Sequence, residues 1–157
     1  MKWLWRSILP LLFIGCLASL LMTGCKNRPP ELTGKWSGNS DLSTQMARAP
    51  GSLQMQNAKA VPVQVTMTLN QNGGGVTGDA AVVISGKPEI HLPITAGVVG
   101  PDGKVSIEAD RSGFSNVHLT FSGNVTAGQL SGDIALKMDT LLGVAVNKGA
   151  ITLKQNS

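Results

Sequence analysis

The chain has 157 residues, 42% of them hydrophobic and 14% charged, with a formal net charge of +4. This length suits one small domain with a single core. Since no run of basic residues stands out, the composition excludes a strongly basic surface, and we expect no nucleic-acid partner. The 19 glycines and the absence of tyrosine are typical of a turn-rich β protein.

The first 24 residues have the pattern of a secretory signal. Lys2 and Arg6 supply positive charge, and an almost wholly apolar run follows over residues 7–23. A charged start, an apolar run and small residues at its end are typical of a cleaved signal. The alternative is a membrane-spanning helix, but 17 residues are at the lower limit for a bilayer, and Pro10 lies inside the run. We therefore predict a signal peptide over residues 1–24.

The end of this run resembles the lipobox of bacterial lipoproteins. Leu21-Met22-Thr23-Gly24 precedes Cys25. In that family the three positions before the modified cysteine hold an apolar residue, then a small or β-branched residue, then Gly or Ala. The resemblance implies cleavage before Cys25, a diacylglycerol on its thiol and a fatty acid such as palmitate on its amine. Two or three acyl chains anchor a protein stably, so we expect membrane attachment through residues 25–31 as a tether. Lys26 after the cysteine implies, in a Gram-negative host, the outer membrane facing the periplasm.

The chemistry of the remaining domain, residues 32–157, is limited. Cys16 leaves with the signal and Cys25 carries lipid, so neither a disulfide nor a thiol nucleophile is left. The sequence has no Ser-His-Asp spacing and no phosphate-binding loop, so we expect no enzyme and no cofactor. His91 and His118 stand on polar faces 27 residues apart, and a metal site would need added carboxylates. We expect no metal.

Apolar residues at every second position predict eight strands. The first covers residues 32–38, and a long segment over 39–60 follows, in which Ser40 or Asp41 is a possible cap for a short helix reaching Ala49. The other predicted strands cover residues 61–70, 76–85, 90–98, 104–110, 117–122, 130–138 and 151–153.

Two details of this alternation matter for the fold. In the strand over 90–98, the residues predicted to face inward are Ile90, Leu92, Ile94, Ala96 and Val98. Pro93 in the same strand has no N–H for the ladder, which indicates an edge or a bulge. In addition, residues 76–82 (VTGDAAV) resemble residues 130–136 (LSGDIAL), which we interpret as a recurring hairpin.

Eight consecutive strands with one polar face each favour a closed antiparallel up-and-down barrel, because closure removes exposed edges. The alternative is a two-sheet β-sandwich. Here the chain resembles the calycin group, the lipocalins and avidin-like barrels, whose first strand opens with G-x-W, as Gly34-Lys35-Trp36 does. The resemblance implies a lipocalin-like barrel with a loop over its mouth. It also implies that Trp36 packs at the closed end against a basic residue of the last strand, for which Lys148 and Lys154 are available.

Two functions remain open. An eight-stranded barrel is either filled or holds one small ligand. Small residues predicted to face inward are Gly78, Ala80, Ala96, Ala109, Gly123 and Gly132. They predict a cavity for a small apolar ligand, with residues 39–60 as a lid, and the expected lining is Trp36, Val65, Met67, Leu92, Leu119, Phe121 and Met138.

The alternative function needs no cavity. A filled barrel predicts a non-enzymatic accessory or structural lipoprotein of the envelope that contacts a protein partner. Phe114, flanked by Gly113 and Ser115, is the candidate contact residue, or else it plugs one end of the barrel.

Overall fold

The computed structural model describes residues 28–47, 60–113, 116–140 and 143–156. The predicted signal peptide, Cys25 and Phe114 lie outside these ranges. The described residues include no helix with the length and apolar character that crossing a bilayer requires.

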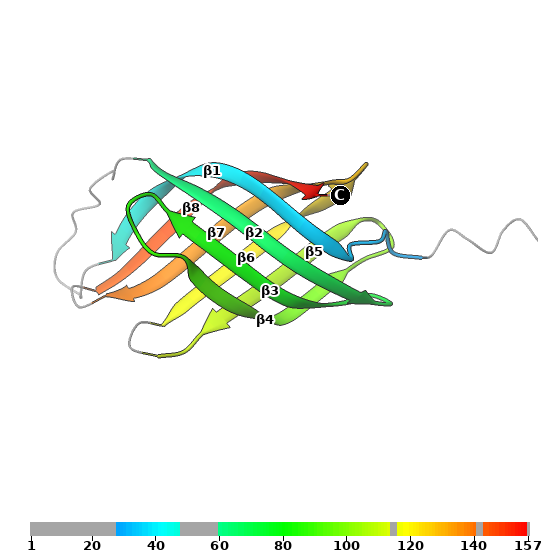
Figure 1. Ribbon diagram of the computed structural model, residues 1–157, viewed down its shortest axis with the longest axis horizontal. Helices are drawn as coiled ribbons and strands as arrows, with labels where there is room; N and C mark the ends of the chain where they lie inside the picture. The colour runs from blue at the N-terminus through cyan, green and yellow to red at the C-terminus, as the bar shows by residue number, and fades with distance from the viewer. Residues whose placement is uncertain (1–27, 48–59, 114–115, 141–142, 157) are drawn as a thin grey trace, which may run out of the picture.

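Eight antiparallel strands form a closed barrel in which each strand pairs with its sequence neighbours and β8 returns to β1 (Figure 1). The strands are β1 (Gly34–Ala47), β2 (Val61–Asn72), β3 (Gly75–Ile84), β4 (Ile90–Val99), β5 (Lys104–Arg111), β6 (Val117–Thr126), β7 (Gln129–Thr140) and β8 (Gly143–Asn156). The predicted up-and-down barrel is confirmed, and the β-sandwich alternative is wrong.

Strands β1 and β8 are longer than the sequence pattern predicted. The helix expected after Ser40 is wrong, because β1 continues as a strand to Ala47 and pairs with the first part of β8. This part of β8, residues 143–150, was not predicted either. Pairing between segments about 100 residues apart overrides the local preference of each segment, since a strand is stabilised by its ladder partner rather than by its own sequence.

The barrel interior is apolar and its outer face is polar. In β2, for example, Val63, Val65, Met67 and Leu69 are buried, whereas Gln64, Thr68 and Asn70 are exposed. The buried side chains of all eight strands belong to one continuous cluster.

Strand β4 contains a bulge that reverses its alternation. Against β5, the register moves from Ile94↔Ala109 to Ala96↔Glu108, so Thr95 is an extra residue. The pairing with β3 shifts in the same stretch. As a result Val98 is 58% exposed and Val99 only 3%. The bulge suggested by Pro93 is confirmed, but the inward placement of Ala96 and Val98 is wrong, because one inserted residue moves all later side chains to the opposite face.

Inward-facing glycines let the strands approach closely. A Cβ on Gly132 of β7 would lie 2.3 Å from the carbonyl oxygen of Ser122, and one on Gly78 of β3 would lie 1.9 Å from that of Thr68. No side chain fits at such distances, so these two positions require glycine. Glycine kinks of this kind let a sheet coil strongly enough to close.

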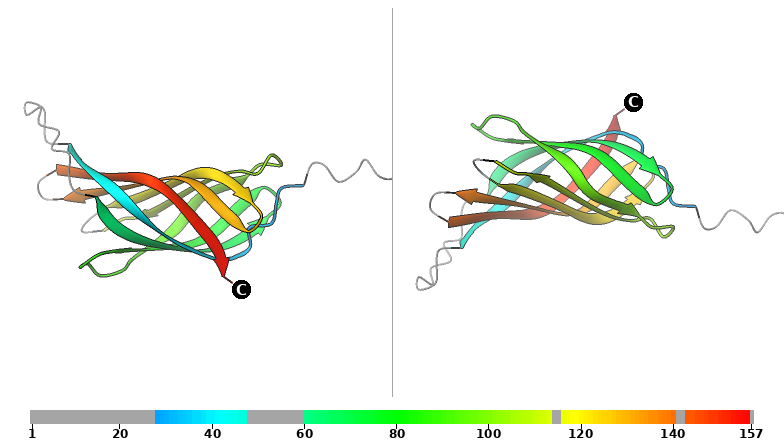
Figure 2. Two further views of the ribbon diagram at one scale, coloured as in Figure 1. Left: turned by 90° about the horizontal axis from the view of Figure 1, so that it is seen from above. Right: turned by 90° about the horizontal axis from the view of Figure 1, so that it is seen from below.

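The two ends of the barrel differ (Figures 1 and 2). One end, called here the tether end, receives the chain at residues 28–33 and carries the turns of residues 73–74, 100–103 and 127–128 and the end of β8. The opposite end, called here the loop end, carries residues 85–89 and the loop that leaves β5.

Candidate functional site

The tether end is closed by Leu32 and Trp36. Both side chains are fully buried in the apolar cluster. The indole Nε1 of Trp36 donates a hydrogen bond to the backbone carbonyl of Leu32 at 2.7 Å, which satisfies the only polar atom of a buried ring. The short segment before β1 is thereby folded back over the end of the barrel.

Three further hydrogen bonds hold this segment. The backbone N–H of Leu32 donates to Oε1 of Gln71 at 2.6 Å, and the N–H of Gln71 donates to the hydroxyl of Thr33 at 3.2 Å. On the other side, Nε2 of Gln155 in β8 donates to the carbonyl of Thr33 at 3.0 Å. The segment is therefore tied to β2 and β8. The sequence did not predict this role for the two glutamines, because the partners of their side chains are backbone atoms distant in sequence.

The basic residue expected beside Trp36 is not found. Lys148 and Lys154 are both exposed on the outer face of β8, and Trp36 faces Gln155 in the β1–β8 register. Neither lysine reaches the interior, because inward positions of this strand are taken by apolar residues such as Ile151 and Leu153. This part of the lipocalin resemblance is wrong for both candidates.

The residues predicted to line a ligand cavity do come together, as parts of the packed core. Val65, Met67, Leu92 and Leu119 are fully buried and Phe121 is 1% exposed. All belong to the same cluster as Trp36, and Met138 packs against it from the loop end. Five hollows in the described part of the chain open on the outer surface and are lined largely by outward-facing residues.

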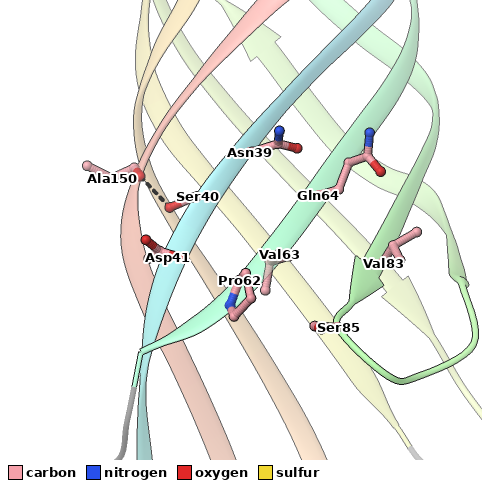
Figure 3. A pocket seen from close by; sticks show the side chains of 9 residues that line it. All are labelled: Asn39, Ser40, Asp41, Pro62, Val63, Gln64, Val83, Ser85 and Ala150. Atoms are coloured by element: carbon pink, nitrogen blue, oxygen red, sulfur yellow. Dashed lines mark hydrogen bonds between the residues drawn. The ribbon is translucent and has the colours of Figure 1, made fainter.

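A shallow outer hollow of about 730 Å³ crosses β8, β1, β2 and β3 (Figure 3). The side-chain amides of Asn39 and Gln64 lie on directly paired positions there, and Ser40 donates a hydrogen bond to the carbonyl of Ala150 at 2.6 Å. These groups offer hydrogen bonds around a hollow that is open to the outside.

Among the residues that the structure describes, the loop end has one buried polar side chain. Asn147 of β8 is 5% exposed and points into the barrel. Its Oδ1 accepts a hydrogen bond from the hydroxyl of Thr44, and its Nδ2 donates to the carbonyl of Leu136 at 3.5 Å. A buried amide with these partners fixes the pairing of β1, β7 and β8. Sequence reasoning missed it because residues 143–150 were not predicted as a strand.

Asp110, His118 and Thr95 form a polar group on the outer face. Oδ1 of Asp110 contacts Nδ1 of His118, and the Thr95 hydroxyl donates to Oδ2 at 2.7 Å. The hydrogen bond with His118, followed by that from Thr95, holds the pKa of Asp110 below its usual range. The Thr95 hydroxyl donates to the carboxylate and not to His118.

The two histidines do not share a site. His91 lies on β4 near Glu89, with 3.5 Å between Nε2 and Oε2, whereas His118 lies on β6. In the described ranges, no three His, Cys, Asp or Glu side chains gather as ligands for a metal ion.

Comparison with known proteins found no matching family model, no matching curated protein and no matching solved structure. The eight-stranded antiparallel barrel is consistent with a lipocalin-like fold.

Proposed function

We propose that this chain is a non-enzymatic envelope lipoprotein, anchored through Cys25, whose barrel is a filled body that presents its outer surface to a partner. The observation that supports this function is the interior: the residues available to line a cavity form one continuous packed cluster with Trp36. A barrel filled by side chains has no room for a cargo molecule.

The position of the tether supports an orientation for such a body. Six residues separate Cys25 from Leu32, and at about 3 Å per residue they reach about 20 Å. The closed tether end then faces the bilayer. Strand β8 has 14 residues, and each residue of a strand adds about 3.3 Å along the strand. With a tilt of about 40° to the barrel axis, the loop end then lies on the order of 35 Å farther from the bilayer than the tether end.

An apolar-ligand carrier is the second candidate function. It is favoured by Val61, Ile90 and Met138, which pack against the core at the loop end yet are only partly buried. These side chains would be the first contacts of a ligand entering from that end.

One experiment tests whether Cys25 carries a lipid anchor and whether the barrel holds a bound compound or is filled by its own side chains. The full chain is expressed in its own host, fractionated, extracted in mild detergent and measured by native mass spectrometry. The proposal predicts membrane fractionation with acyl mass on Cys25, and no further mass lost on organic extraction. The Cys25→Ala chain should carry no acyl mass, while Cys16→Ser, the matched control, should behave as wild type.

Two results would contradict the proposal. A wild-type chain that carries no acyl mass on Cys25 would refute the anchor. An apolar compound that copurifies with the Cys25→Ala chain and is released by extraction would identify the barrel as a carrier.

A further inference from the structure

The end of strand β4 is compatible with two registers. In the structure Thr95 is the extra residue of the bulge, Val99 is buried and Val98 is exposed. If the residues after Thr95 moved by one position against β3 and β5, the bulge would disappear. Ala96 and Val98 would then face the core, whereas Gly97 and Val99 would face outward. This second register is the one that the alternation of the sequence predicted.

Both neighbouring strands accept the second register at once. The pairings before the bulge, continued without an extra residue, set Ala96 between Val76 of β3 and Ile107 of β5. Val76 and Ile107 are buried, so Ala96 would join them in the core. The extra residue would pass into the turn, whose loop would lengthen from residues 101–103 to residues 100–103. Hairpin loops of three and of four residues are both common.

The burial of apolar side chains does not decide between the two registers. One valine is buried in either case, Val99 in the present register and Val98 in the second. The second register would also bury the methyl group of Ala96, which is exposed at present, and apolar burial is favourable. The present register is therefore held by other contacts.

Gly97 permits the present register but does not fix it. A Cβ at this position would lie 2.4 Å from the backbone carbonyl oxygen of Val76, so a residue with a side chain could not face inward here. A glycine is tolerated equally on the outer face, where no side chain has to fit. The contact that fixes the register must hold the extra residue itself.

Asp110 makes that contact. The Thr95 hydroxyl donates a hydrogen bond to Oδ2 of Asp110 at 2.7 Å, and it also lies 3.4 Å from the backbone carbonyl oxygen of Glu108. Oδ1 of the same carboxylate contacts Nδ1 of His118 on β6, which holds the carboxylate in place. In the second register Thr95 would lie opposite Glu108 and diagonally from Asp110. Diagonal neighbours are about 7 to 8 Å apart, too far for two short side chains to keep this hydrogen bond.

We propose that the end of β4 is a two-register switch, and that Asp110 latches it in the register that contains the bulge. With the latch closed, Val98 is displayed on the outer face, where it borders a hollow of about 620 Å³. With the latch open, Val98 enters the core and Val99 takes its place outside. Two packings of one segment that differ little in free energy are the basis of such switches.

Cysteine labelling reads the register directly. Residues 32–157 contain no cysteine, so a cysteine at position 98 or 99 of the full chain reports its own exposure to a maleimide, and the chain without an added cysteine gives the background. Val98→Cys should label fast and Val99→Cys slowly, since the two valines are 58% and 3% exposed. Asp110→Ala and Thr95→Val should each raise the rate at Val99→Cys about threefold to fivefold, because one hydrogen bond to a partly exposed carboxylate is lost.

A third cysteine distinguishes a change of register from a loosened sheet. Val105 of β5 lies opposite Val99 and is 2% exposed. Local opening would expose both positions, whereas the second register leaves Val105 inside, so Val105→Cys should label at its wild-type rate in Asp110→Ala. Glu108→Ala is the matched control, because it removes an exposed carboxylate of β5 and keeps the backbone carbonyl near Thr95. It should change none of the rates.

Deletion of Thr95 removes the extra residue and with it the bulge that the switch requires. The residues after it should keep their present faces, because the pairings on the two sides of the bulge then run on continuously. In this background Asp110→Ala should no longer raise the rate at Val99→Cys. Circular dichroism checks that each variant is folded, and Thr95→Val makes the same test if Asp110→Ala is not.

Three results would overturn the switch. The first is an unchanged rate at Val99→Cys in both Asp110→Ala and Thr95→Val. The second is an equal rise at Val99→Cys and Val105→Cys, which would mean that the sheet opens locally. The third is a rise in the Val99→Cys rate that persists after Thr95 is deleted.

Discussion

The indole of Trp36 and the backbone carbonyl of Leu32 close the tether end of the barrel through one hydrogen bond of 2.7 Å. Both side chains are completely buried, so the segment that carries the chain toward residue 25 is part of the core.

Trp36→Phe should destabilise the barrel by about 2 kcal/mol. The phenyl ring keeps part of the apolar contact but leaves the Leu32 carbonyl without its donor and opens a small void. Urea unfolding followed by circular dichroism measures the change. An unfolding midpoint equal to that of wild type would show that this contact does not hold the end closed.

Gly132→Ala should destabilise the barrel by about 3 kcal/mol or more. The added Cβ would meet the carbonyl oxygen of Ser122 at 2.3 Å, and neither strand can move without breaking ladder bonds. Gly128→Ala is the matched control: its φ of +74° carries a cost of about 1 kcal/mol, but no atom lies within 4 Å of its added Cβ. Equal losses in thermal or urea unfolding would contradict the close approach.

The bulge in β4 predicts opposite effects at adjacent residues. Val98→Lys should change the free energy of unfolding by less than about 0.5 kcal/mol, because this side chain is already exposed. Val99→Lys should cost about 3 kcal/mol or more, because it places an ammonium in an apolar interior. An unbulged strand would give the reverse order in the same unfolding measurement.

Asp110 should make stability depend on acid pH. Its pKa in the folded chain is lowered from 3.8, mainly by the hydrogen bond with His118. The stabilisation is therefore fully present above the unfolded value and is lost as the pH falls below about 4 through the lowered pKa. Asp110→Asn should flatten this acid loss and cost less than about 1 kcal/mol at neutral pH, since the pair is partly exposed.

The matched control for this pH profile is Asp102→Asn. Asp102 also has a lowered pKa, through its hydrogen bond with Lys104 in a turn, but it is the more exposed of the two carboxylates, at 52% against 41% for Asp110. We expect its acid unfolding curve, followed by circular dichroism, to match wild type. If both variants flatten the curve equally, the pair on the outer face of β5 and β6 has no special role.

The sequence by itself determined the strand pattern. Alternation along residues 61–70 or 117–122 follows from one apolar and one polar face, a local property that needs no knowledge of the partner strand. Eight such segments with short connections also favoured closure, since an open sheet would leave two edges unpaired. The placement of Trp36 at the closed end was predicted from the resemblance of Gly34-Lys35-Trp36 to the opening of calycin barrels, and not from the alternation.

Only the tertiary structure decided the features that depend on neighbours. The extra residue at Thr95 becomes visible when β4 is set against β5, and it moved Val98 from the core to the surface. Residues 143–150 became a strand because β1 and β7 flank them, and this buried Asn147. The continuous apolar cluster is likewise a result of closure. A strand pattern indicates which side chains point inward, but the space left among them depends on how tightly eight strands coil around glycines such as Gly78 and Gly132.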